Sequence, residues 1–203
     1  MTLWHRLHRE FARRRLRDAS CAYLFAPPPA NEWVSLDCET SSLNPRSAEI
    51  ISIAAIRVHD HRIASASALR LKIRPQRPLA VDSIPIHLLR EQDLADGLPL
   101  DEALEQLLRF VGSRPLLGYY LEFDLALLNR DLRGRLGVRL PNAAIDVSGL
   151  YYDRQVSAYR PEVDLSLSTI LAELNLPDLP RHDPFNDALL AAMIFLKLRG
   201  NRA

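Results

Sequence analysis

The stretch EWVSLDCETSSLNP, residues 32 to 45, places two acids directly after an apolar run that reads as a buried strand. Side chains two residues apart in a strand point to the same face. We therefore expect Asp37 and Glu39 to project together, while Cys38 packs on the opposite side. Two neighbouring carboxylates repel each other, and a cation between them relieves the repulsion. A solvated strand end is the alternative, and this stretch alone leaves both interpretations open.

The composition is that of a globular domain. The chain has 203 residues, of which 48% are hydrophobic and 25% charged, and no apolar run reaches the roughly 18 residues needed to cross a bilayer. The net charge is +1, so any affinity for nucleic acid has to come from local patches. The two cysteines lack the spacing of a metal site, which predicts a reduced protein. The polar start lacks the features of a secretory signal, so we expect a cytoplasmic protein that does not associate with membranes.

The first 18 residues predict a helix, because Trp4, Leu7 and Phe11 form one apolar stripe. We expect this stripe to pack on the domain and the arginines that follow it to be solvated. A surface for a protein partner, or a phosphate contact, is the alternative. A Pro-rich linker follows the helix. The chain then divides into an N-terminal helix with its linker, residues 1–31, and a main domain, residues 32–203.

The remaining periodicity predicts strands that come first in a group and then alternate with helices. The predicted strands are 33–37, 50–58, 63–73, 114–120 and 143–148, and the predicted helices are 86–95, 100–111, 122–133, 166–175 and 184–198. The third strand alternates apolar and basic side chains, which is typical of a sheet edge. This order indicates an α/β fold with a mixed sheet.

Further acids stand at the starts of two predicted helices. Asp124 opens a helix after the fourth strand, where an isolated acid is usually a cap. In the segment RHDPFND, Asp183 is suited to cap the last helix. Asp187 then lies at the mouth of an apolar, buried helix, with His182 in the loop before it. Acidic oxygens without a Cys or His cluster suit a hard ion such as Mg²⁺ or Mn²⁺.

Together these residues resemble the DEDDh 3′–5′ exonucleases of the RNase H-like superfamily, relatives of the proofreading subunit of bacterial DNA polymerase III and of RNase T. The resemblance covers about residues 32–198 and implies a mixed five-stranded sheet flanked by helices, here with an extra N-terminal helix. Asp183 occupies the place where the tyrosine branch has Tyr, which indicates the histidine branch. The three matching motifs are D-x-E-T at Asp37, Glu39 and Thr40, F-D at Phe123 and Asp124, and H-x4-D at His182 and Asp187.

The resemblance also implies the roles of the site residues. It implies two ions, Mg²⁺ or Mn²⁺, about 4 Å apart at the scissile phosphate. Asp37 would bridge both ions, and Glu39 and Asp187 would hold the ion that carries the attacking water. Asp124 would hold the ion at the leaving 3′ oxygen. His182 would be the general base.

Four residues are expected at the substrate. Thr40 would meet the terminal nucleotide and Leu43 would form a wedge or floor near its base. His87 would touch the end nucleotide, or only pack. The family often carries His-Asn shortly before its F-D pair, and here Tyr119 and Tyr120 replace them. Tyr120 is expected either to line the groove and stack a base or to pack in the core.

The predicted function is a two-metal 3′–5′ exonuclease that releases nucleoside 5′-monophosphates from 3′ ends or single strands, with DNA favoured over RNA. An exoribonuclease or short-oligonucleotide nuclease is one alternative, and a polymerase-associated proofreading module is another. The chain carries no long extension after its last predicted helix, which favours a free-standing enzyme. The N-terminal helix would be the docking element for a protein partner.

Overall fold

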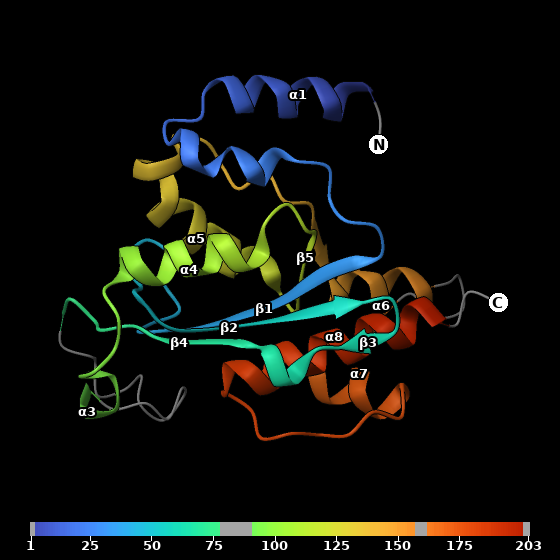
Figure 1. Cartoon of the computed structure of the whole chain (residues 1–203). Helices are drawn as coiled ribbons and strands as arrows, with labels where there is room; N and C mark the ends of the chain where they lie inside the picture. The colour runs from blue at the N-terminus through green and yellow to red at the C-terminus, as the bar shows by residue number, and fades with distance from the viewer. Residues whose placement is uncertain (1–2, 78–90, 157–161, 201–203) are drawn as a thin grey trace.

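The structure, a computed structural model, describes residues 3–77, 91–156 and 162–200, and a mixed sheet with helices on both faces forms its centre (Figure 1). No helix among these residues is long and apolar enough to span a membrane. The strands are β1 (Glu32–Thr40), β2 (Ile50–His59), β3 (Arg62–Ile63), β4 (Leu69–Lys72), β5 (Leu116–Gly118) and β6 (Ala144–Asp146). The helices are α1 (Leu3–Arg14), α3 (Glu91–Leu94), α4 (Leu100–Val111), α5 (Leu121–Leu136), α6 (Val147–Gln155), α7 (Leu167–Glu173) and α8 (Pro184–Gly200), with 3₁₀ turns η1 (Ala19–Phe25) and η2 (Ser65–Ser67).

The sheet has the order β3-β2-β1-β5-β6, and β4 also pairs with β2. β1 runs antiparallel to β2 and parallel to β5, and β5 is parallel to β6. The β1–β2 register places Asp37 opposite Ala54 and Glu39 opposite Ser52, and it shifts between Glu39 and Thr40. Such irregularities bend a strand and re-aim its side chains. The bend in β1 therefore falls within the D-x-E-T motif.

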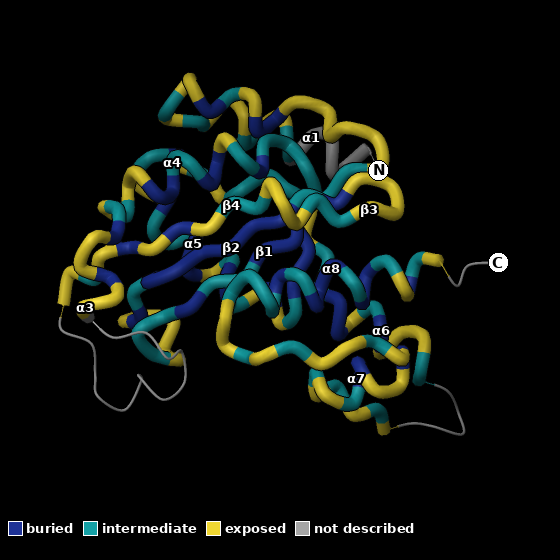
Figure 2. The backbone as a smooth tube through the Cα atoms, turned by 60° about the horizontal axis from the view of Figure 1, so that its bottom comes forward, coloured by how far each residue is buried: buried dark blue, intermediate teal, exposed yellow. Residues whose placement is uncertain are grey.

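Both faces of β1 are covered, and its alternate residues meet different helices. Val34 and Leu36 belong to the core beneath α4 and α5. Trp33 points to the other face, where its ring lies 5.1 Å from that of Phe195 on α8. Figure 2 shows the central parts of β1 and β2 buried between these layers. Because side chains alternate along a strand, Asp37 and Glu39 share the α8 face with Trp33.

The N-terminal helix differs from the prediction. Phe11 is 55% exposed, so the end of the apolar stripe is not buried. The guanidinium carbon of Arg15 lies 4.5 Å from the centroid of the Phe11 ring. The side chains of Trp4 and Leu7 lie outside the described residues. Arg9 adds polar contacts between α1 and the body, by donating to the carbonyl of Pro141 at 2.6 Å and that of Leu24 at 3.0 Å. The chain after α1 does enter the core, through the buried side chains of Cys21, Leu24 and Phe25.

The predicted third strand is wrong in its middle. Residues 65–67 form η2, which leaves β3 and β4 as separate strands, and the sheet has six strands instead of five. The Ala and Ser residues there have low strand propensity and small side chains to pack. Helix α4 matches its predicted bounds. The sequence analysis missed α6, which Asp146 caps through the N–H groups of Ser148 and Gly149. Of the predicted helix 86–95, only α3 lies within the described residues.

Candidate active site

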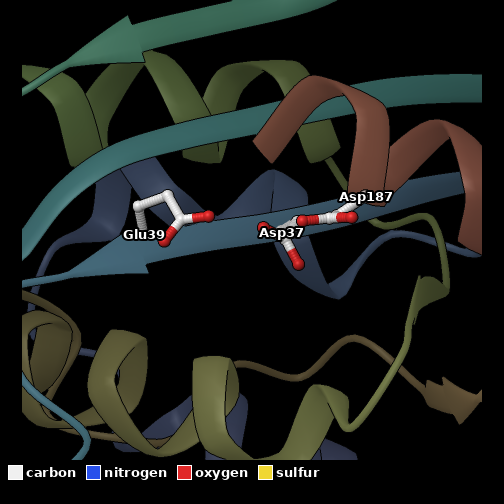
Figure 3. A group of neighbouring side chains, drawn as sticks. All are labelled: Asp37, Glu39 and Asp187. Atoms are coloured by element: carbon white, nitrogen blue, oxygen red, sulfur yellow. The ribbon is translucent and has the colours of Figure 1, made fainter. Parts of the chain in front are cut away.

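Strand β1 and the first turn of α8 bring three carboxylates together. Asp37 and Glu39 project from β1 and Asp187 from α8, and their carboxylates turn toward one another (Figure 3). One oxygen of each lies within 4.8 Å of the others. The buried hydroxyl of Ser35 donates to the Ala188 carbonyl at 2.6 Å. That hydrogen bond fixes the start of α8 against the strand that carries the other two acids.

Asp124 reaches the site from the other face of the sheet. It lies in the first turn of α5 and is only 5% exposed, and it is not part of the group of three. Cys38 is half-buried against the core on this side, as expected, and its thiol also hydrogen-bonds Asp124. Burial raises the pKa of Asp124 to about 7, although hydrogen bonds from the thiol and backbone of Cys38 oppose the rise.

Burial and mutual repulsion raise the pKa of the acids on β1. For Asp37 the pKa lies well above its usual range, because the carboxyl is desolvated and then because Asp124 and Asp187 repel its charge. For Glu39, which is 8% exposed, desolvation followed by repulsion from Asp187 and Asp124 raises the pKa to about 8. Burial and repulsion thus disfavour the ionised forms of these carboxyl groups. A cation between them would favour the ionised forms.

The residues present fit a hard divalent ion. Oδ2 of Asp187 accepts a 3.0 Å hydrogen bond from the backbone N–H of His182, but Oδ1 is buried and has no partner among the described residues. A buried, unpartnered carboxylate oxygen is costly. The same carboxylate belongs to the group of three that includes Asp37 and Glu39. All of these donors are oxygens, which Mg²⁺ and Mn²⁺ prefer.

His182 sits in a constrained loop immediately before α8. Its backbone is left-handed, with φ of 61°, a conformation that costs a non-glycine residue roughly 1 kcal/mol or more. Asp183 caps α8 by accepting from the N–H of Phe185 at 2.9 Å, as the sequence predicted. His182 lines the cavity that Asp37, Glu39 and Asp187 also line.

A cavity of about 390 Å³ adjoins the acids and has a largely apolar wall. Thr40 lines it, with its hydroxyl donating to the Ser42 carbonyl at 2.9 Å. Leu43 also lines it and is 74% exposed, so this side chain is free to meet a ligand. The predicted substrate residue His87 lies outside the described residues.

Two tyrosines complete the wall of this cavity. Their ring centroids lie 4.5 Å apart. Tyr119 is fixed, because its hydroxyl donates to the Leu165 carbonyl at 2.8 Å, and burial raises its pKa to about 12. Tyr120 is 50% exposed and has a left-handed backbone with φ of 50°. Tyr119 thus serves as packing, while Tyr120 presents an open ring face.

The sequence analysis missed two residues that position this wall. Oδ2 of Asp146 accepts from the N–H of Leu121 at 2.9 Å, which ties the start of α5 to the end of β6. Gly118 allows close packing here, since a Cβ atom would lie 2.7 Å from Leu121 Cδ1 and 3.0 Å from the Leu36 carbonyl oxygen. A single sequence carries no signal for either contact beyond the Asp that ends a short strand.

A comparison with protein families matches residues 34–195 to the exonuclease family that includes RNase T. The chain belongs to this exonuclease family. The match confirms the predicted family and its class of domain, a nuclease of the exonuclease type. It spans β1 to α8 and therefore contains every described residue of the three motifs.

Curated relatives of this exonuclease domain are DNA polymerase III proteins. A PolC-type DNA polymerase III from Thermotoga petrophila is 25% identical over 165 residues, which cover 81% of this chain and 12% of the relative. The DNA polymerase III epsilon subunit of Haemophilus influenzae is 24% identical over 180 residues, 85% of this chain and 69% of the subunit. The chain thus spans about an eighth of the length of the PolC-type relatives it matches.

Solved structures of other exonucleases share the fold. E. coli exonuclease I in its zinc-bound complex with single-stranded DNA has a TM-score of 0.73 at 12% identity, over 86% of this chain and 41% of that one. Exonuclease X in complex with 5′-overhanging duplex DNA has a TM-score of 0.64 at 20% identity, over 84% of this chain and 92% of that one. These matches confirm the predicted RNase H-like architecture.

Proposed function

We propose that this domain is a 3′–5′ exonuclease of the histidine branch that releases nucleoside 5′-monophosphates with two divalent ions, Mg²⁺ or Mn²⁺. One observation carries the proposal: the oxygens of Asp37, Glu39 and Asp187 lie within 4.8 Å of one another, and a buried oxygen of Asp187 has no partner among the described residues. Phosphodiester hydrolysis needs an activated water and stabilisation of a highly charged transition state. Bound divalent ions supply both.

Four acids would hold the ions. Asp37 belongs to the group with Glu39 and Asp187, and the charge of Asp124 also acts on it, which suits it to bridge two ions. Glu39 and Asp187 would hold the first ion with Asp37. Asp124, which stands apart from that group, would hold the second.

His182 would take the proton of the attacking water. The loop before α8 places this imidazole on the cavity that Asp37 and Asp187 also line. Its backbone N–H holds Asp187, so the positions of base and ligand are linked through the same loop. A general base of this kind contributes roughly 10²–10⁴ in rate.

The cavity beside the acids would receive the 3′-terminal nucleotide. Tyr120 offers an exposed ring on which a base can stack, and Leu43 and Thr40 add an apolar and a polar side chain to the lining. A pocket with one apolar wall and a few polar groups is typical of small-ligand sites. The predicted contact of His87 with the end nucleotide, or its packing alone, lies outside the described residues.

We favour DNA as the substrate, because the curated relatives are named DNA polymerase III proteins. The same names support a second candidate function, proofreading in association with a polymerase. Helix α1 would supply the partner surface, because Phe11 and the neighbouring Arg13 and Arg14 are exposed on it.

The test is the digestion of 5′-labelled and 3′-labelled single-stranded DNA, RNA, and duplex DNA with or without a mismatched 3′ end, in the presence of Mg²⁺ or Mn²⁺. The proposal predicts that the 3′ label leaves first, as a mononucleotide, and that the 5′ label remains on a ladder of shortening products. Faster removal of mismatched ends would favour the proofreading function, if a polymerase also retains the protein in the presence but not the absence of residues 1–14, which carry α1. Initial release of the 5′ label would refute the proposed polarity.

A further inference from the structure

A second groove leads away from the acids on the side of β4. It has a volume of about 740 Å³ and is lined by parts of β2 and β4 and by residues 180–186. His182 lines both this groove and the 390 Å³ cavity beside the acids. The two spaces therefore share His182 as part of their walls.

The groove carries two cations that have no acidic partner among the described residues. Arg70 and Lys72 are two residues apart on β4, so their exposed side chains lie on the same face of that strand. Within residues 3–77, 91–156 and 162–200 neither has an acidic partner, and Lys72 donates only to the Asp93 carbonyl, at 3.2 Å. Basic side chains of this kind favour a phosphate backbone.

The remaining charges in the groove are already engaged. Arg181, at the junction with His182, pairs with Asp178 at 2.9 Å. The carboxylate of Asp183 is occupied as the cap of α8, where it accepts from the N–H groups of Phe185 and Asn186. Among the described residues of the groove, the cations without an acidic partner therefore lie on β4.

Phe185 adds an aromatic surface to the groove. The Arg70 guanidinium carbon lies 3.5 Å from the centroid of the Phe185 ring, so the cation is held against the ring face. Phe185 lies in the first turn of α8, two residues before Asp187. Bases of single strands stack on aromatic rings and on guanidinium planes. The Arg70–Phe185 pair and Lys72 together offer one stacking contact and one phosphate contact beside the site.

We propose that this groove binds the single-stranded nucleic acid on the 5′ side of the scissile phosphate. The inference rests on the proposed exonuclease function and adds where the substrate strand enters. The terminal nucleotide occupies the cavity with Tyr120, the strand crosses His182, and the next nucleotides follow β4 over Arg70 and Lys72. Unpaired bases are required for stacking on the Arg70–Phe185 pair, so single strands and frayed ends are favoured over intact duplex ends.

The test compares Arg70→Glu and Lys72→Glu with Arg139→Glu. Arg139 is an exposed arginine after the far end of α5, a helix of 16 residues that spans about 24 Å from the site. Two quantities are measured on each protein: the binding of labelled oligothymidylate by fluorescence anisotropy in EDTA, and kcat/KM with Mg²⁺ on oligothymidylates of increasing length. Lys72→Glu leaves the Arg70–Phe185 contact in place, so it serves if Arg70→Glu does not fold.

We expect the affinity for the oligonucleotide to fall about tenfold or more in the two β4 variants and to stay unchanged in Arg139→Glu. In the β4 variants the slope of log affinity against log salt concentration should be smaller by about 0.7 for each lost phosphate contact. The loss in kcat/KM should grow from the dinucleotide to longer chains. Equal binding in all three variants, or a loss of kcat/KM that is independent of length, overturns the inference. If the wild-type protein hydrolyses no oligonucleotide, the proposed function fails, and the anisotropy comparison still decides whether the groove binds the strand.

Discussion

The backbone N–H of His182 donates a 3.0 Å hydrogen bond to Oδ2 of Asp187, while the other oxygen of that carboxylate is buried without a partner among the described residues. One loop therefore positions both the candidate base and a candidate metal ligand. The left-handed backbone at His182 makes this possible, since it turns the N–H back toward the first turn of α8. Strained conformations of this kind persist where the surrounding structure imposes them, often at functional sites.

His182→Asn distinguishes the role of the imidazole from that of the loop backbone. Asn adopts left-handed backbone readily, so the N–H contact to Asp187 should survive. We expect the single-turnover rate at neutral pH to fall by roughly 10²–10⁴ and Mn²⁺ affinity, measured by calorimetry, to stay close to that of the wild type. His182→Gly is the matched control for the backbone and should be equally slow. A variant that keeps the wild-type rate would remove His182 from the base role.

Metal-free protein should lose stability as the pH rises. The folded state raises the pKa of Glu39 to about 8 from 4.5, so it binds this proton more tightly than the unfolded state does. That stabilisation is complete below the pKa of the unfolded state and is lost as the pH rises through the pKa of the folded state. The unfolding free energy should fall by up to about 1.4 kcal/mol per pH unit for each carboxyl. Urea unfolding in EDTA between about pH 5 and 8 measures it.

Two comparisons make that pH prediction specific. Glu39→Gln should flatten the pH dependence of the unfolding free energy, whereas Asp153→Asn, a change at an exposed acid on α6, should not. Mg²⁺ should reverse the loss at high pH, because it binds the ionised carboxylates. A stability of the metal-free wild type that rises from acidic to mildly basic pH would contradict this electrostatic account.

Ser35→Ala tests whether α8 must be fixed to β1 for activity. Loss of the buried hydroxyl that donates to the Ala188 carbonyl should cost about 1 kcal/mol of unfolding free energy. It should also lower kcat by about tenfold or more, because Asp187 follows the helix start. Ser113→Ala removes an exposed hydroxyl, which donates to the Pro27 carbonyl at 3.2 Å away from α8, and should leave kcat unchanged. If Ser35→Ala lowers stability but not kcat, the contact is structural only.

Tyr120→Asn should change stability and substrate binding in opposite directions. Asn tolerates the left-handed backbone at φ of 50°, so relief of strain should raise the unfolding free energy by about 1 kcal/mol. Loss of the exposed ring should raise KM for single-stranded DNA by about tenfold, since a base stacked on an aromatic ring contributes roughly 1–3 kcal/mol. Melting curves and steady-state kinetics separate the two effects. An unchanged KM would assign Tyr120 to packing alone.

Much of the fold could be predicted from periodicity. Helix α4 and strand β2 carry complete apolar patterns, and their predicted bounds agree with the structure to within one residue. Strand β4 could not be separated from β3, because an Ala-Ser segment keeps an alternating pattern while it adopts a 3₁₀ turn. The exposure of Phe11 also differs from the prediction, because its ring lies against the Arg15 side chain rather than in the core.

The site was predictable where period-2 geometry governs it. The sequence placed Asp37 and Glu39 on one face, and the structure has them there with Asp187. Approach of Asp124 from the opposite face, through its contact with Cys38, depends on how α5 packs and leaves no mark in the sequence. The Arg70–Phe185 contact likewise joins residues more than a hundred positions apart.

The most direct test of the central claim is hydrolysis of 5′-labelled single-stranded DNA by wild-type protein and by Asp37→Asn in the presence of Mg²⁺. Asn keeps the size of the side chain and removes its charge, so the fold should survive, and circular dichroism checks this. The account predicts a 3′-shortening ladder from the wild type and no detectable product from Asp37→Asn. A folded Asp37→Asn variant that degrades DNA at the wild-type rate would contradict it.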